Sequence, residues 1–148
     1  MSDNILIQDT LRATFNAALS VYTRMVEQHG VGFFDGGCLS FALAAQSLIP
    51  DSQLYHVSRT KQGCDHIALY ISQLDAYVDA DGLRSKAALI TKMREVEKID
   101  VQFCEPATHF TGLVEYEDVV EEIVLKAKAT MSTNSQLKMI KKAALKLQ

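Results

Sequence analysis

One cysteine of this chain stands where a thiol could act as a nucleophile. Cys38 follows a glycine-rich loop, VGFFDGG, and opens an apolar, alanine-rich segment, CLSFALAAQSLI, that is typical of a buried helix. The thiolate is the nucleophilic form of cysteine, and the free N–H groups and the dipole at a helix start favour an anion there. The sequence therefore predicts an activated thiol at Cys38.

The loop before Cys38 has the composition of a substrate-binding loop. Gly36 and Gly37 carry no side chain that would keep a substrate away from the backbone. The N–H of Cys38 would then help to stabilise an oxyanion. Phe33 and Phe34 would either line a substrate groove or form a hydrophobic plug under the loop. Our candidate substrate-binding residues are Gly36, Gly37 and Phe34.

His66 and Asp79 are expected to meet in an antiparallel hairpin. Residues 66–71 and 76–79 alternate as strands, so the first residue of one strand would lie beside the last residue of the other. An imidazole near a thiolate can hold a proton and later donate it to a leaving group. A carboxylate on its far side fixes the tautomer and stabilises the charged ring. The sequence thus predicts a catalytic triad of Cys38, His66 and Asp79.

Other aspartates near these strands compete for the same role. Asp81 is the alternative partner for His66, and either Asp79 or Asp81 could instead cap the DADG turn. Asp65 precedes His66 and is expected to point to the opposite face of the strand. We favour Asp79 because it closes the alternation of its strand.

A zinc site is a different interpretation of the same region. The residues of a type that zinc uses as ligands are Cys64, His66, Cys104 and His109. Their spacing matches no strong zinc pattern. Cysteine is also among the most buried residue types, so Cys38 could be a core residue at a helix start.

The periodicity of the chain predicts an α+β domain in which helices surround a small antiparallel sheet. Helical spacing covers residues 4–28, 38–49, 83–97 and 115–131, and strand-like alternation covers residues 53–59, 66–71, 76–79 and 99–104. The central helix that carries Cys38 is expected to pack on the sheet. Residues 1–131 are predicted to form one domain, followed in residues 132–148 by a polar hinge, STNS, and a short basic helix.

Composition narrows the classes of function. The chain has 148 residues, of which 48% are hydrophobic and 22% charged, as in ordinary soluble domains. A formal net charge of −3 gives no overall electrostatic reason to expect a nucleic-acid partner or an anionic membrane. No apolar stretch is long enough to cross a bilayer, so no membrane insertion is expected. The lysines near the C-terminus form either the solvated face of a helix or a surface for an acidic partner or a membrane: Lys138, Lys141, Lys142 and Lys146.

The cysteine count and the first residues of the chain bear on location. Three cysteines, an odd number, are expected to be free thiols in a reducing compartment. The N-terminal residues, MSDNILIQDTLRATF, do not have the pattern of a secretory signal. We therefore expect a cytoplasmic protein, or one delivered to another cell by a route that needs no such signal.

Three segments in order, GGCLSFALAAQ, DHIALYI and YVDADG, resemble the core of papain-like and transglutaminase-like cysteine hydrolases. The resemblance covers residues 30–82. It implies a nucleophile that opens a central helix on an antiparallel sheet, with the histidine and the aspartate on adjacent strands. That superfamily includes peptidases, transglutaminases and glutamine deamidases, some of the last being bacterial effectors. Two features depart from it, because Gly32 stands where papain-type enzymes have a glutamine and the chain has no tryptophan.

The expected function is cysteine-dependent hydrolysis of an amide in a protein or peptide substrate, as peptidase or glutamine deamidase, with no metal or organic cofactor. Cys38 would attack the carbonyl carbon and expel an amine or ammonia, and water would then release the thioester. Peptide hydrolysis and deamidation use the same three residues, so the triad does not separate them. The alternatives are a catalytically silent protein-binding module on the same scaffold and a metal-binding regulator.

Overall fold

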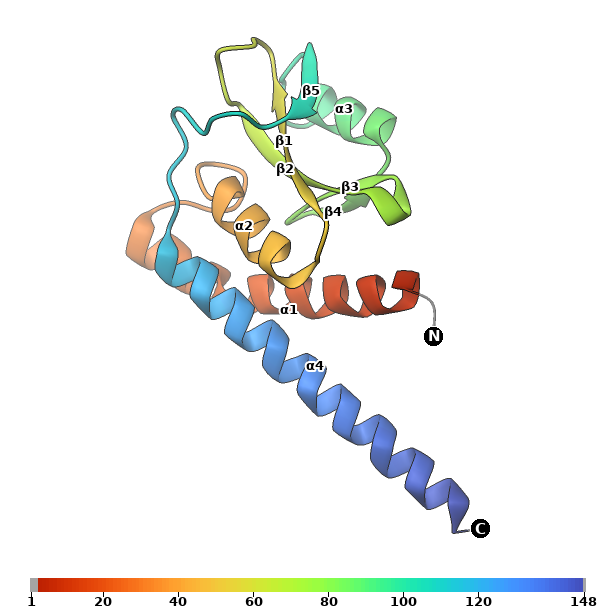
Figure 1. Ribbon diagram of the computed structural model, residues 1–148. Coiled ribbons are helices and arrows are strands. Elements are labelled where there is room, and N and C mark those ends of the chain that lie inside the picture. Colours follow the sequence, from red (N-terminus) through yellow and green to blue (C-terminus); the bar gives the residue numbers. More distant parts are fainter. Residues whose placement is uncertain (1–2, 148) are drawn as a thin grey trace.

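Residues 3–147, which the computed structural model describes, form helices around one five-stranded sheet (Figure 1). The helices are α1 (Asp3–His29), α2 (Cys38–Leu48), α3 (Lys86–Glu95), α4 (Glu117–Lys146) and the short 3-10 helix η1 (Ser72–Leu74). The strands are β1 (Gln53–Ser58), β2 (His66–Ile71), β3 (Ala76–Asp79), β4 (Gly82–Arg84) and β5 (Phe103–Pro106). The predicted α+β class and the small antiparallel sheet are therefore confirmed.

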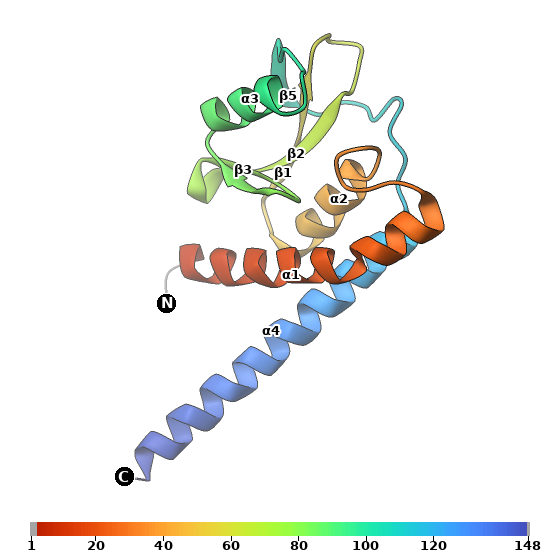
Figure 2. The same ribbon diagram turned by 180° about the vertical axis from the view of Figure 1, so that it is seen from behind.

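The sheet is antiparallel throughout and has the order β4-β3-β2-β1-β5. The predicted hairpin of β2 and β3 is present, with Leu69 opposite Val78 and Ile71 opposite Ala76. This register puts Asp79 level with Ala68, so His66 and Asp79 are diagonal neighbours and do not face each other directly as predicted. One face of the sheet packs on α2, behind which α1 and α4 lie, and the other face packs on α3 (Figures 1 and 2). The sheet is thus covered on both faces, and α2 is the central helix of the larger core.

Helix α2 begins at Cys38, as the sequence predicts, and ends just before Pro50. Proline disfavours helical geometry in the residue before it, and Ile49 is extended accordingly. The helix is buried along most of its length, in Cys38, Leu39, Ser40, Phe41, Ala42, Ala44 and Ala45. Its small alanines let the sheet and α4 approach the helix closely on different sides. The Ser40 hydroxyl accepts a hydrogen bond from the N–H of Tyr116 at 2.8 Å, which ties the start of α4 to α2.

Two predicted elements begin later in the chain than expected. The helix predicted for residues 83–97 begins only at Lys86, because residues 82–84 pair with β3 as strand β4. Ser85 caps that helix by accepting a hydrogen bond from the N–H of Ala88 at 3.2 Å. The strand predicted for residues 99–104 forms at Phe103–Pro106, where it pairs with β1. In both cases strand pairing, a tertiary interaction, set the boundary.

The predicted hinge at residues 132–135 is wrong. These residues are helical, and α4 continues without a break from Glu117 to Lys146, so there is no separate basic helix. Serine, threonine and asparagine are weak helix formers, but the segment holds neither glycine nor proline to end the helix. The buried residues of α4, which are Val119, Ile123 and Ala127, all lie in its first half. Beyond them the helix projects from the body (Figures 1 and 2).

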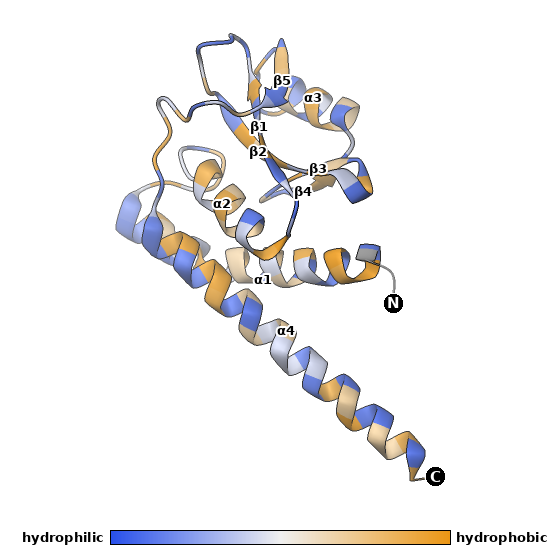
Figure 3. Ribbon diagram, viewed as in Figure 1, coloured by the Kyte–Doolittle hydropathy of each residue, from blue (hydrophilic) through white to orange (hydrophobic). Residues whose placement is uncertain are grey.

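Hydropathy changes along α4. Its projecting part mixes hydrophilic and hydrophobic residues (Figure 3). No helix within residues 3–147 is both long and apolar enough to cross a membrane.

Candidate active site

Three elements bring Cys38, His66 and Asp79 together. Cys38 is the first residue of α2, His66 is the first residue of β2, and Asp79 is the last residue of β3. Because β2 and β3 are antiparallel, the start of one and the end of the other lie at the same end of the sheet. The His66 Nε2 atom lies 3.0 Å from Asp79 Oδ2, and the ring lies close enough to the Cys38 thiol for each group to shift the pKa of the other. The structure thus places the three predicted residues in one connected chain of contacts.

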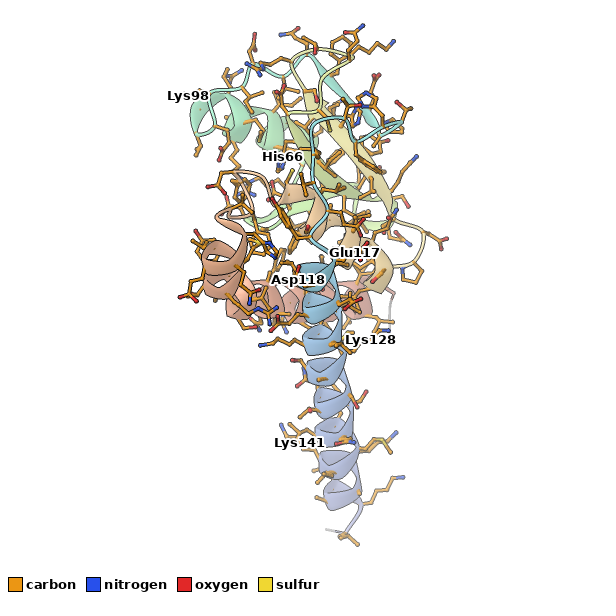
Figure 4. The ribbon with its side chains drawn as sticks, turned by 90° about the vertical axis from the view of Figure 1, so that its left-hand side faces the viewer. His66, Lys98, Glu117, Asp118, Lys128 and Lys141 are labelled. Carbon is orange, nitrogen blue, oxygen red and sulfur yellow. The ribbon has the colours of Figure 1, made fainter. Side chains whose placement is uncertain are left out.

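The contact chain passes around the end of the sheet. Side chains alternate along a strand, so His66 and Asp79 share a face with Ala68 and Tyr77, which is the face that α3 covers. Cys38 comes from α2 on the other face. Only at the strand end can an imidazole reach from one face to a helix on the other. Figure 4 shows His66 inside the sheet-containing body of the molecule.

The hydrogen bonds assign the two ring nitrogens of His66. Asp79 occupies Nε2, so Nδ1 is the nitrogen that remains for the thiol. The other carboxylate oxygen, Asp79 Oδ1, accepts a hydrogen bond from the N–H of Asp81 at 3.0 Å. Both oxygens of Asp79 are therefore held, and the carboxylate in turn holds the imidazole in one orientation.

The surroundings of Cys38 favour its thiolate. Burial alone would raise the pKa of this thiol, but the hydrogen bond and the charge of His66 more than offset burial, and the pKa is lowered overall. Hydrogen bonds from the backbone N–H groups of Ile67 and Leu39 contribute to the same lowering of the pKa. Leu39 lies in the first turn of α2, where N–H groups have no partner within the helix.

His66 is shifted in the complementary direction. Burial would lower its pKa, but hydrogen bonds and charge from Asp79 and Cys38 raise the pKa to about 9. The pKa of Asp79 is lowered, because its hydrogen bond and charge interaction with His66 outweigh burial. The three shifts together favour a Cys38 thiolate beside a protonated His66 and an ionised Asp79.

Two cations flank Asp79, and nothing in the sequence pattern pointed to them. Lys92 on α3 has its Nζ 3.7 Å from Asp79 Oδ2 and 3.1 Å from Asp81 Oδ2. Arg84 on β4 has Nη1 3.7 Å from Asp79 Oδ1, and its Nη2 pairs with Asp81 at 2.8 Å. Asp81, the rival partner for His66, thus pairs with cations. Arg84 is placed by strand β4, and Lys92 is placed by α3, which begins at Lys86. Because the sequence predicted one helix over residues 83–97 and no strand β4, it did not predict these two cations beside Asp79.

Phe34 lies against the imidazole. Its ring stacks on His66 with centroids 5.7 Å apart, and Lys92 Nζ lies 3.8 Å from the centroid of the same ring. The neighbouring Phe33 is buried and contacts Phe41 of the core edge-on. Phe33 is therefore part of the hydrophobic plug under the loop, which was one of the two predicted roles. Phe34 instead covers the triad.

The triad is closed in this structure. Cys38 is 6% exposed and His66 is 3% exposed, so no open cleft leads to either side chain. A cavity of about 490 Å³ lies next to the loop, between α1 and the segment after α3, and Phe34 and Ala80 are among its lining residues. None of the three triad residues lines this cavity. Phe34 therefore stands between the cavity and the imidazole.

The glycines of the loop have a structural reason of their own. A Cβ on Gly37 would lie 2.7 Å from the carbonyl oxygen of Gly32, with which the Gly37 N–H forms a 2.9 Å hydrogen bond. Gly36 has a φ of 129°, which side chains rarely allow. A Cβ on Gly32 would meet the side chains of Tyr22 and Asp35 at 3.1 Å, so a glutamine there would require those side chains to shift by a few tenths of an ångström. The substrate-binding role predicted for Gly36 and Gly37 stays a prediction beside this packing role.

The other residues that the sequence offered as metal ligands or as partners of His66 have different neighbours. Within residues 3–147 no three His, Cys, Asp or Glu side chains are grouped to hold a metal ion. His109 instead packs edge-on against His56, with ring centroids 4.5 Å apart, and its carbonyl bonds His56 Nε2. Asp65 pairs with Arg59, in line with its predicted orientation away from His66.

Neither of the remaining thiols has an environment that favours a thiolate. Burial, followed by the charges of Cys38 and Asp65, raises the pKa of Cys64 to about 12. Burial also raises the pKa of Cys104. The surroundings therefore favour the reactive thiolate form at Cys38 and disfavour it at the other two cysteines.

Comparison of the chain with models of known protein families, with curated protein sequences and with solved structures found no match.

Proposed function

We propose that the protein is a cysteine-dependent amide hydrolase with Cys38 as nucleophile, His66 as acid and base, and Asp79 as the residue that orients His66. One observation carries the proposal: a thiol with a lowered pKa is joined to an imidazole with a raised pKa, and a carboxylate holds that imidazole at 3.0 Å. A buried structural cysteine needs no such partners, and burial alone would raise its pKa.

The proposed reaction has two steps. The Cys38 sulfur attacks the carbonyl carbon of the amide, and the C–N bond breaks as His66 Nδ1 gives its proton to the leaving nitrogen. Water then attacks the thioester while His66 accepts a proton from it, which releases a carboxylate and restores the thiolate. The N–H groups at the start of α2, which have no partner within the helix, would stabilise the oxyanion.

The proposed scaffold is papain-like. Support comes from the position of the nucleophile at the start of a central helix, the antiparallel sheet against which that helix packs, and the order Cys38, His66, Asp79 along the chain. The proposed substrate is a protein or peptide. Hydrolysis of a peptide bond and deamidation of a glutamine side chain are both compatible with the triad.

Burial of the triad favours one second candidate, a protein-binding module on the same scaffold without turnover. With Cys38 6% exposed and Phe34 stacked on His66, an amide can reach the sulfur only if the loop before α2 moves. Under this alternative the loop would stay closed and the thiol would be unreactive.

Alkylation of the native protein decides between the two. At about pH 6, iodoacetamide should label Cys38 at least about tenfold faster than Cys64 or Cys104, as read by mass spectrometry of peptides, because only Cys38 has a lowered pKa. His66→Ala should remove that advantage, whereas His109→Ala should not. Slow labelling of all three thiols in the folded protein would contradict the proposal and favour the binding module.

Turnover is tested separately on denatured proteins and glutamine-containing peptides. New amino termini would identify a peptidase, and a glutamine-to-glutamate mass change would identify a deamidase. His66→Ala should reduce either rate by about 10²–10⁴-fold, the usual contribution of general acid–base catalysis. Turnover that survives Cys38→Ser would overturn the triad.

A further inference from the structure

Charge is distributed very unevenly between the body of the molecule and the projecting part of α4. Residues 1–127, which end at the last buried residue of α4, hold all 18 acidic residues and ten of the 15 lysines and arginines, so their formal charge is −8. Residues 128–148 hold five lysines and no acidic residue, so their formal charge is +5. The net charge of −3 hides this separation. A helix of such charge is complementary to an anionic surface.

The projecting part of α4 carries apolar and basic residues on different sides, except that Met139 and Leu145 lie among the lysines. An apolar stripe, defined by Leu137, Ile140, Ala144 and Leu147, follows helical spacings of three and four residues. A lysine stripe, defined by Lys138, Lys141, Lys142 and Lys146, follows the same spacings on another side of the helix. Every residue of both stripes is exposed, and the large residues of the apolar stripe range from 50% exposed at Leu137 to 89% at Leu147. Leu137 lines a shallow hollow with Asp9 and Arg12 of α1, and Ile140 and Leu147 are more exposed than Leu137.

The last turns of the helix lie away from the acidic body. Asp9 of α1 reaches α4 at Lys138, with its Oδ2 3.4 Å from Lys138 Nζ, and Lys146 lies about 12 Å beyond Lys138 at the helical rise of 1.5 Å per residue. This distance exceeds the Debye length of about 8 Å at physiological ionic strength. An anionic surface at the far end of α4 would therefore interact with Lys146 while the charge of the body is largely screened. Figure 4 shows Lys141 on the projecting part, far from His66.

We propose that the C-terminal part of α4 binds an anionic lipid surface, with the apolar stripe in the headgroup boundary and the lysine stripe at the lipid phosphates. Lysine stems can lie along the apolar boundary while their ammonium groups reach the anionic headgroups. Pairing of two copies through the apolar stripe is less favourable, because Lys141 borders that stripe and would meet its counterpart in the second copy. The helix lies on the surface and does not cross it. This inference is independent of the chemistry at Cys38.

The test is cosedimentation of the full chain with lipid vesicles. The protein should bind vesicles of phosphatidylcholine containing a minority of phosphatidylserine, should bind pure phosphatidylcholine at least tenfold more weakly, and should be released by salt. Leu137→Ser with Ile140→Ser should weaken binding at least tenfold, and so should Lys142→Gln with Lys146→Gln. Met139→Ser is the matched control, because Met139 is 71% exposed but lies outside the apolar stripe.

Four outcomes would overturn the proposal: no binding to either vesicle, equal binding to both, equal loss in the Met139 control, or a concentration-dependent dimer that the apolar double variant disrupts. The last outcome would assign the apolar stripe to a second copy, and the first would leave an acidic protein as the complementary partner. Circular dichroism of each variant checks that the helix content is retained. Because all substituted side chains are exposed, the body of the protein should keep its fold.

Discussion

The charge of His66 is governed by a small number of neighbours. Cys38 and Asp79 contact the ring directly, Phe34 covers it, and Lys92 touches both Phe34 and Asp79. The two anionic partners raise the pKa of His66 to about 9 against the effect of burial. The positive charge of Lys92 also interacts with the Asp79 carboxylate. It therefore partly offsets the effect of that carboxylate on the pKa of His66.

We predict opposite shifts of the His66 titration in two variants. Asp79→Asn removes a charge that favours the imidazolium, so the pKa of His66 should fall from about 9 toward its ordinary 6.5. Lys92→Met removes a cation near Asp79, so the pKa should rise, whereas Lys92→Arg should restore it. The measurement is NMR titration of the His66 ring, and the alkaline limit of Cys38 reactivity should move with it. Shifts of the same sign in both charge-removing variants would contradict this account.

The same pKa shift links folding to pH. A group whose pKa is raised on folding, from 6.5 to about 9 here, contributes stability that is fully present below pH 6.5 and is lost as the pH rises through 9. The lowered pKa of Cys38 acts in the opposite direction over this range, because the folded thiol has lost a proton that the unfolded thiol keeps. Cys38→Ser removes that contribution, so the free energy of unfolding of Cys38→Ser should decline more steeply over this range than that of the double variant Cys38→Ser with His66→Gln. Urea unfolding at a series of pH values gives both curves, and identical slopes would show that His66 is not protonated in the native state.

Among the elements, the loop before α2 sets the position of the nucleophile. The hydrogen bond from Gly37 to Gly32 closes this loop directly before Cys38, and the first N–H groups of α2 then surround the sulfur. Phe34, in the same loop, stacks on His66. A small displacement of the loop would therefore change both the position of the Cys38 thiol and the contact of Phe34 with His66.

Gly37→Ala tests the loop. Its Cβ would lie 2.7 Å from a backbone oxygen that cannot rotate away, so we expect a loss of about 1–3 kcal/mol in the free energy of unfolding and slower alkylation of Cys38. Gly63→Ala is the control, because its Cβ would meet only the hydroxyl of Thr60, the end of a side chain in an exposed turn. Equal losses in the two variants, measured by urea unfolding, would show that the Gly32 contact does not constrain the loop.

Taken as a whole, the molecule is a compact body from which half of one helix extends. The core contacts of α4 end at Ala127, and the exposed pair of Lys138 and Asp9, at 3.4 Å, is a weak link between the rest of α4 and α1. The body should therefore fold without the projecting part, while Ile123 and its neighbours are indispensable.

Deletion of residues 132–148 tests this division. The shortened chain should keep its free energy of unfolding within about 1 kcal/mol and keep the fast labelling of Cys38, because exposed pairs contribute little. Ile123→Ala in the full chain should cost about 2–5 kcal/mol, as buried isoleucines do. A deletion as costly as Ile123→Ala would mean that the end of α4 stabilises the body.

The sequence by itself determined the class of the fold, the helix that begins at Cys38, the β2–β3 hairpin and the order of the three triad residues. These features depend on local periodicity and on the spacing of 13 residues between His66 and Asp79, which a short hairpin converts into contact. Glycine and proline near α2 marked its ends because their backbone preferences act locally.

Only the tertiary structure decided what surrounds the triad. Strand β4 is three residues long and exists because β3 is beside it, and it places Arg84 near Asp79, while α3 brings Lys92 from farther along the chain. The choice of Asp79 over Asp81, the cover of Phe34 and the closed state of the thiol depend on the same long-range packing. So does the projection of α4, because a helix carries no local signal of whether another surface will cover it. Helices and strands produce a regular spacing of apolar residues in the sequence, but contacts between distant residues produce no such spacing.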